Sequence, residues 1–326
     1  MNFVHHFSLR AKRFLCLAAL LPTLAFSQAW PTKQAVKLIV VFPPGGSADQ
    51  VARIIGPVLS QQIGQSVIVE NKGGASGVIG TSSMLAAPAD GYTFAVVFDT
   101  HGVNQSLIPN MPYDSKKDLV PLILVGTSAM VLTSNVGNEY KTFADVVAAA
   151  KAKKNVSFGT IGNGSLGHLA MALLSKNYNM EFNHIPYKGG GPLMTDAVAG
   201  HVPLALGTVF LSKPHIDNKR IRPLAVTSLK RVAEFPDTPT MAESGFPGFE
   251  ASAWWALLAS AKTPPDIVKR MNDELNKVLQ NPEVAHKLSA QGIDISGGSV
   301  DKAKNFIDKQ LDTWAKVVRE NGIKPD

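Results

Sequence analysis

"KLIVVFPPGGSADQVARIIGPVL", residues 37–59, joins an apolar run to a helical pattern through two prolines and two glycines. The apolar run, which ends at Phe42, is typical of a strand buried on both faces of a sheet. After the glycines, apolar side chains recur at helical spacing, and Ser47 followed by Gln50 predicts a helix start with a capping box. Pro57 predicts a kink in that helix. A strand that leads directly into a helix is the repeating unit of an α/β fold.

The same unit recurs along the chain, which predicts a parallel sheet with helices on both faces. After a last apolar run at 251–260 the pattern is helical, and these late helices have no strands of their own, so we expect them to pack on the first sheet. The further apolar runs lie at 66–71, 92–98, 122–134, 156–160, 182–187, 202–210 and 221–228, and the late helical patterns at 265–280, 282–291 and 300–320.

The chain is long enough for two domains, each of the doubly wound α/β class. We expect a discontinuous domain I, made of residues 30–128 and 256–326, and a continuous domain II, residues 129–255. The chain would pass between them near residues 125–132 and 254–260, and these two passages would form a hinge.

Residues 1–29 have the layout of a secretory signal peptide. Three basic residues precede an apolar run, and small residues follow it, which predicts cleavage after Ser27 or Ala29. The run is shorter than the roughly 20 residues that a membrane anchor needs. The single cysteine, Cys16, lies within this segment, so disulfide and thiol chemistry are not expected in the exported protein.

Composition argues against several classes of function. Removing the three basic residues of the leader changes the net charge from +7 to +4, because 29 Lys and Arg then face 25 Asp and Glu. The excess is scattered and contains no long basic run, so no nucleic-acid partner is expected. The eight His residues show no zinc-ligand spacing, and no metal is expected.

A literal G-x-G-x-x-G occurs at Gly162, Gly164 and Gly167, between a predicted strand and a predicted helix. A dinucleotide site would also need an acidic residue at the end of the following strand, whereas Glu181 precedes that strand. Nicotinamide cofactors are also improbable ligands of an exported protein, so no cofactor is expected. The bare N–H groups at a helix start still attract anions of any kind, and an anion site remains the interpretation.

Ser165 and His168 in this stretch raise the alternative of an exported hydrolase with a nucleophile and a base. No G-x-S-x-G motif is present, and no acidic residue is placed to orient the histidine. A serine that caps a helix is the simpler interpretation.

Two more stretches, "PPGGSAD" at 43–49 and "GGASGVIG" at 73–80, repeat the arrangement of strand, glycine-rich loop and helix. Glycine lets a ligand approach the backbone closely, and the helix starts supply free N–H donors. Turn chemistry alone explains any one of these loops. Three such loops in two domains predict a cleft that closes on one acidic ligand.

These stretches also carry a resemblance to a known family. The ordered combination of "LIVVFPPGGSADQVAR" (38–53), "SFGTIGNGSLGHLAMALL" (157–174), "IPYKGGGPLMTDAVAGHV" (185–202) and the run at 221–259 resembles the Bug-type receptors of tripartite tricarboxylate transporters. The likeness covers essentially the whole chain after the leader. It implies a periplasmic solute-binding protein with a two-domain, hinge-closing fold of the Venus flytrap type, and not an enzyme.

The resemblance further implies that backbone groups and waters of both domains hold a ligand carboxylate. Carried over position by position, the expected ligand-binding residues of domain I are Phe42, Pro44, Gly45, Gly46, Ser47, Asp49, Ala75, Ser76, Gly77, Thr100 and His101. Those of domain II are Gly162, Asn163, Gly164, Ser165, His168, Tyr187, Gly189, Gly207 and Thr208.

One departure bears on the ligand. Family members often have an aspartate within the stretch that reads "VPLALGTVF" here, where this chain has Gly207 and Thr208. A carboxylate there could pair with the amino group of a ligand, so its absence favours a plain carboxylate, such as a dicarboxylate or an aromatic acid. Asp49, Glu70 and Asp99 remain open as site groups or as capping and surface charges. The expected partners are the ligand and the membrane subunits of a transporter or a signalling protein, and the receptor is expected to be a monomer.

Overall fold

The structure is a computed structural model and describes residues 30–322. Its strands are β1 (Val36–Val40), β2 (Val67–Asn71), β3 (Thr93–Phe98), β4 (Leu119–Asn135), β5 (Val156–Thr160), β6 (Phe182–Pro186), β7 (Leu204–Thr208), β8 (Ile221–Val226), β9 (Ser252–Ser260) and β10 (Asp294–Ile295). Neighbouring strands follow the order β2-β1-β3-β9-β4-β7-β5-β6, and β8 and β10 also pair with β4.

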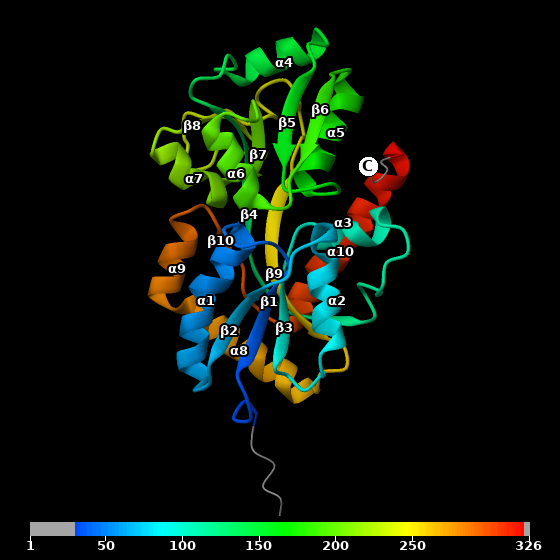
Figure 1. Ribbon diagram of the computed structural model, residues 1–326, viewed down its shortest axis with the longest axis vertical. Coiled ribbons are helices and arrows are strands. Elements are labelled where there is room, and N and C mark those ends of the chain that lie inside the picture. The colour runs from blue at the N-terminus through cyan, green and yellow to red at the C-terminus, as the bar shows by residue number, and fades with distance from the viewer. Residues whose placement is uncertain (1–29, 323–326) are drawn as a thin grey trace, which may run out of the picture.

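Strand β4 divides the molecule into two halves. Its residues 119–129 pair with β9, whereas residues 130–135 pair with β7 and β8. We call the part with β1, β2, β3, β9 and β10 the first half, and the part with β5, β6, β7 and β8 the second half. Figure 1 shows them as the lower and upper parts, with β4 and β9 along the middle.

Helices cover the sheets of both halves, as an α/β fold requires (Figure 1). The late helices pack on the first half, where α8 and α10 contact β4 and α9 contacts α1. The helices are α1 (Ser47–Ile63), α2 (Val78–Ala86) preceded by the 3₁₀ turn η1 (Ala75–Gly77), α3 (His101–Leu107), α4 (Phe143–Lys151), α5 (Leu166–Tyr178), α6 (Gly190–Ala199), α7 (Val209–Asp217), α8 (Pro265–Gln280), α9 (Pro282–Ser289) and α10 (Val300–Asn321).

The sheet is mixed, so the prediction of a parallel sheet is only partly right. Strands β2, β1 and β3 are parallel, as are β7, β5 and β6, whereas β9 and β4 run antiparallel to their neighbours. The reason is that β4 passes straight from one half to the other and β9 returns beside it. Because β9 lies between β3 and β4 and runs opposite to both, the middle of the sheet is antiparallel.

The apolar stripe of α1 is buried as predicted, but its start differs from the prediction. The N-cap is Gly46, and no side chain caps the helix. The Ser47 hydroxyl instead accepts a hydrogen bond from the Trp255 indole N–H (3.3 Å). The Gln50 side chain donates to the Gly45 carbonyl (3.4 Å) and not to the backbone of Ser47. The predicted capping box is therefore wrong, and the first N–H groups of α1 have no side-chain partner.

Other differences lie at element ends. The predicted strand 202–210 ends at Thr208, because that residue caps α7 by accepting a hydrogen bond from the Leu211 N–H (3.1 Å). Helix α3 and the short strand β10 were not predicted, since each is too short to show a periodic pattern.

Strand β9 pairs only with β3 and with residues 119–129 of β4. The second passage of the chain between the halves therefore lies at or before Ser252, a few residues earlier than the predicted 254–260. The three domain segments, 30–128, 129–255 and 256–326, remain a proposal. The expected signal segment, residues 1–29, lies outside the described residues. Within residues 30–322, no helix combines the length and the apolar character that crossing a membrane requires.

Candidate functional site

The glycine-rich loops of the two halves lie in direct contact. The loop between β1 and α1 touches the start of α6, so that a Cβ atom added to Gly191 would lie 2.8 Å from the Pro44 carbonyl oxygen and 3.4 Å from the Gly45 carbonyl carbon. A Cβ atom added to Gly189 would lie 3.2 Å from the Pro43 ring and 3.5 Å from the Phe42 ring. Glycine is thus needed here because the two backbones approach closely.

A second contact joins η1 to the loop that contains the G-x-G-x-x-G. The Ser76 hydroxyl donates a hydrogen bond to the Asn163 carbonyl oxygen (2.7 Å), which links the first half to the second. Ser76 itself has a positive φ, and the Asn104 side chain donates to its carbonyl oxygen (3.0 Å), which holds this strained turn in place. The structure therefore brings four of the predicted loops together at one interface.

Asp49 holds the loop between β1 and α1. One of its carboxylate oxygens accepts the Gly45 N–H (3.0 Å), and the other accepts hydrogen bonds from Arg53 (3.0 Å) and Asn71 (2.9 Å). Burial acts to raise the pKa of Asp49, but these three hydrogen bonds outweigh it and the pKa lies below its usual value. All of these partners belong to the first half, so the carboxylate of Asp49 is a positioning group for the loop.

Ser165 and His168 are not arranged as a nucleophile and a base. The Ser165 hydroxyl donates to Thr160 Oγ1 (3.1 Å) and accepts the backbone N–H of His168 (3.3 Å). The His168 ring accepts the Gly164 N–H through Nδ1 (3.2 Å) and stacks on the ring of His184, with 4.1 Å between their centroids. The serine is fully buried and acts as the N-cap of α5, which was the simpler of the two interpretations.

Three other predicted residues, His101, Gly207 and Thr208, lie away from the loop contacts, whereas the carbonyl oxygen of Tyr187 would lie 3.2 Å from a Cβ atom added to Gly162. His101 packs edge-on against Trp254 and lines a small cavity with Ser115 and residues of α10, and burial lowers its pKa to about 4. Gly207 and Thr208 face the interior of the second half, where a Cβ atom added to Gly207 would lie 3.2 Å from Ser212 Oγ. Tyr187 donates its hydroxyl to Asp196 (2.8 Å), within the same half.

The helix starts at the interface differ in how their N–H groups are satisfied. No side chain caps α1, α2 or α6, whose N-cap residues are Gly46, Gly77 and Gly189. Helix α5, in contrast, is capped by Ser165. The residues predicted from the sequence included Gly189, the N-cap of α6, but not Gly190 and Gly191, although the three consecutive glycines were a visible signal.

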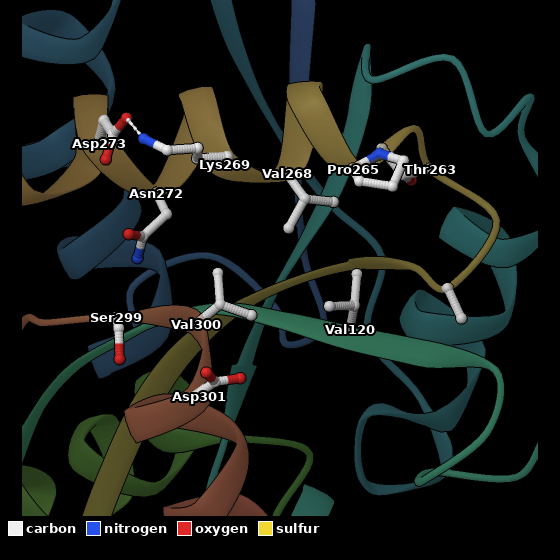
Figure 2. Close-up of a pocket in the computed structure, with 11 residues that line it drawn as sticks. Val120, Thr263, Pro265, Val268, Lys269, Asn272, Asp273, Ser299, Val300 and Asp301 are labelled. Carbon is white, nitrogen blue, oxygen red and sulfur yellow. Dashed lines mark hydrogen bonds and ion pairs between the residues drawn. The ribbon is translucent and has the colours of Figure 1, made fainter.

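A separate pocket of about 540 Å³ lies between α8 and the start of α10 (Figure 2). Figure 2 shows Lys269 paired with Asp273, and the Asn272 side chain donates to the carbonyl oxygens of Leu122 (2.7 Å) and Gly298 (2.8 Å). These three polar side chains thus bond within the protein, and none of the residues that line the pocket belongs to the loops described above. Within residues 30–322, no cluster of His, Asp or Glu is placed to hold a metal ion.

Comparison with known proteins identifies the group to which this arrangement belongs. Residues 51–323 match the family model TctC, described as the tripartite tricarboxylate transporter family receptor. The chain belongs to this receptor family. Protein BugT of Bordetella pertussis is 37% identical over 292 residues, which cover 89% of this chain and 90% of BugT. The resemblance seen in the sequence is thereby confirmed.

Solved structures of similar proteins share the fold. A protein described as a periplasmic transporter is 34% identical, with a TM-score of 0.87 and coverage of 91% of this chain and 100% of that one. A protein of R. palustris whose structure holds adipate is 33% identical, with a TM-score of 0.86 and the same coverage. MatC from Rhodopseudomonas palustris, with bound malate, is 25% identical, with a TM-score of 0.83 and coverage of 88% and 99%. The α/β fold of a periplasmic binding protein, built from two parts, is confirmed.

Proposed function

We propose that this chain is an exported receptor that captures a small organic acid between its two halves. The carrying observation is the meeting of two uncapped helix starts, those of α1 and α6, where a Cβ atom added to Gly46 would lie 3.5 Å from the Gly190 nitrogen. A third uncapped start, that of α2, directly follows the turn in which Ser76 bonds to the second half. Each start offers backbone N–H donors and the positive end of a helix dipole, and a carboxylate is the small group that both features favour. Similar proteins with adipate and malate bound support the same ligand class.

The halves close around the ligand by rotating about the strands that join them. The contacts between the loops, such as the hydrogen bond from Ser76 to Asn163, form only when the halves are together. A ligand that forms hydrogen bonds with both halves stabilises the closed form relative to the open form. The ratio of its affinities for the two forms determines how far the population moves toward the closed form.

The competing function is hydrolysis at Ser165. The bonds of that hydroxyl to Thr160 and to a backbone N–H argue against it, because a nucleophile needs its base at the hydroxyl. The membership of the chain in a receptor family also favours binding.

The remaining parts of the proposal are export to the periplasm and delivery of the ligand to the membrane subunits of a tripartite transporter or to a signalling partner. The layout of residues 1–29 and the similar periplasmic transporter support the location. The family description supports the transport role. We expect the receptor to act as a monomer, since both halves of its site come from one chain.

A thermal-shift screen of the purified protein against organic acids tests the binding function. At 1 mM, a ligand with a Kd near 10 μM adds about 2.7 kcal/mol to the free energy of unfolding. That gain raises Tm by about 4 °C for a protein of this size. Positive compounds are then titrated by calorimetry against the wild type and Lys188→Ala, the exposed lysine beside the Gly189 loop.

Backbone recognition predicts that Lys188→Ala weakens binding only slightly. If this variant keeps its fold but no longer binds the ligand, an ion pair with Lys188, and not the backbone, holds the carboxylate. If the protein binds none of the acids and hydrolyses an ester, and the hydrolysis disappears in Ser165→Ala, the receptor proposal is wrong and the hydrolase alternative is right.

A further inference from the structure

Asp99 follows β3 directly and lies buried between the two halves, with 2% of its surface exposed. Its carboxyl group faces two backbone N–H groups, that of Thr100 and that of Leu166 in the first turn of α5. Neither contact has the geometry of a regular hydrogen bond, and both carboxyl oxygens are buried without a partner. Within residues 30–322 Asp99 belongs to no ion pair. A buried carboxyl group with so few partners requires an explanation.

The position of Asp99 changes the expected use of α5. Ser165 already caps this helix, and the N–H group of Leu166 points toward the carboxyl group of Asp99. The anion site predicted from the G-x-G-x-x-G is therefore already faced by a carboxyl group of the protein itself. A ligand carboxylate is left with the starts of α1, α2 and α6, which have no such partner.

Asp99 also lies at the same sheet edge as one of those starts. Strands β1 and β3 are parallel neighbours, and β1 leads into the loop before α1 while β3 leads into Asp99. The rings of Phe42 and Phe98, the last residues before the two loops, meet edge-on with 6.2 Å between their centroids. The parallel register thus places Asp99 beside the loop that leads from β1 into α1.

Burial raises the pKa of Asp99 to about 8, because the charged form is poorly solvated there. A desolvated carboxylate gains most from a cationic donor, which supplies both an opposite charge and several hydrogen bonds. An ammonium group has three donors and can satisfy oxygens that the protein leaves unpaired.

We propose that Asp99 determines the ligand class by pairing with an ammonium group, so that the receptor prefers amino acids over plain carboxylic acids of the same length. This inference rests on the proposed function, in which the helix starts hold the ligand carboxylate. The sequence predicts a plain carboxylate as ligand, because Gly207 and Thr208 occupy the stretch where family members often have an aspartate. The inference reverses that expectation, because Asp99 supplies a carboxyl group from another position.

Matched pairs of ligands test the proposal by isothermal titration calorimetry at pH 7. The pairs are aspartate and succinate, glutamate and glutarate, and 2-aminoadipate and adipate, with each amino acid used as the racemate. The members of a pair differ only in the ammonium group. We expect the amino acid of the best-binding pair to bind at least about tenfold more tightly than its plain partner, because only the amino acid forms charge-assisted hydrogen bonds with Asp99.

Asp99→Asn keeps the shape of the side chain and removes its charge. We expect it to weaken binding of the amino acid by tenfold or more and to leave the plain acid unchanged or bound more tightly. Asp273→Asn, an exposed position on α8, is the matched control for a change in net charge and should leave the ratio within each pair unchanged.

Two different failures can be told apart. If plain acids bind the wild type as tightly as their amino partners, the role of Asp99 is overturned while the receptor function stands. If no acid binds the wild-type protein in the thermal-shift screen, the proposed function itself fails. Because the first comparison uses only the wild type, it does not depend on the folding of Asp99→Asn.

Discussion

Gly191→Ala should separate closure of the receptor from its folding. The three nearest atoms to an added Cβ all belong to the loop of the other half, namely the carbonyl oxygen of Pro44 and two backbone carbons of Gly45 at 3.4 and 3.6 Å. Gly191 lies in the first turn of α6 and its φ is not positive, so alanine fits the backbone of the isolated half. The substitution therefore acts on the contact between the halves.

The magnitude follows from the 2.8 Å between that Cβ and the Pro44 oxygen. Ordinary contact begins near 3.4 Å, so the halves or the loop must separate by about 0.6 Å at this point. The loop resists because the Gly45 N–H donates to Asp49, whose carboxylate is held in turn by Arg53 and Asn71. Overpacking of this kind costs about 1–3 kcal/mol, which corresponds to a loss of affinity of roughly 5- to 150-fold.

Calorimetry with the tightest-binding acid measures this loss, and small-angle scattering with saturating ligand should give a larger radius of gyration than for the wild type. The free energy of unfolding of the ligand-free protein should stay the same or rise by up to about 1 kcal/mol, since alanine replaces glycine in a helix. Gly56→Ala is the control, because its Cβ would contact only Val69 and Val67 of the same half at 3.6 and 3.8 Å. Wild-type affinity and wild-type compaction in Gly191→Ala would refute closure onto this loop.

Three further predictions concern single side chains. Burial raises the pKa of Asp99 to about 8, so the folded state holds a proton that the unfolded state has lost between pH 4 and pH 8. The free energy of unfolding should therefore fall by up to about 1.4 kcal/mol per pH unit as the pH rises through this range. Urea titrations of Asp99→Asn should no longer show this decline. Asp49→Ala should destabilise the protein by about 1–3 kcal/mol and weaken ligand binding, because the Gly45 N–H loses its acceptor; unchanged values in both measurements would contradict its positioning role. Ser165→Ala should cost about 1 kcal/mol of stability through loss of the α5 cap, as measured by thermal unfolding, without removing any hydrolytic activity.

The α/β class and most of the helices could be predicted because their apolar residues repeat with a clear period. The late helix α8 begins and ends where its pattern predicts, at Pro265 and Gln280. The antiparallel course of β4 and β9 could not be predicted, since a run buried on both faces looks the same in either direction. Strand order is decided by pairing between residues far apart in sequence, such as Phe98 with Trp255.

The loops of the candidate site were visible as glycine-rich stretches, but their uses were not. Whether a helix start is free depends on contacts that sequence spacing does not reveal, such as the Leu166 N–H facing Asp99 across the interface. The same holds for Ser47, whose hydroxyl bonds to Trp255 and does not cap its own helix. The ligand-binding set from Phe42 to Thr208 therefore stays a prediction for the binding measurements to decide.

Strand β4 has a consequence for how the molecule unfolds. It supplies one strand to the sheet of each half, so neither half has a complete sheet without it. Melting of either half would strip one end of this strand of its partners and expose apolar residues such as Leu124 or Leu132. We therefore expect the two halves to lose their structure together, as a single cooperative unit, even if they rotate as separate bodies during the proposed ligand capture.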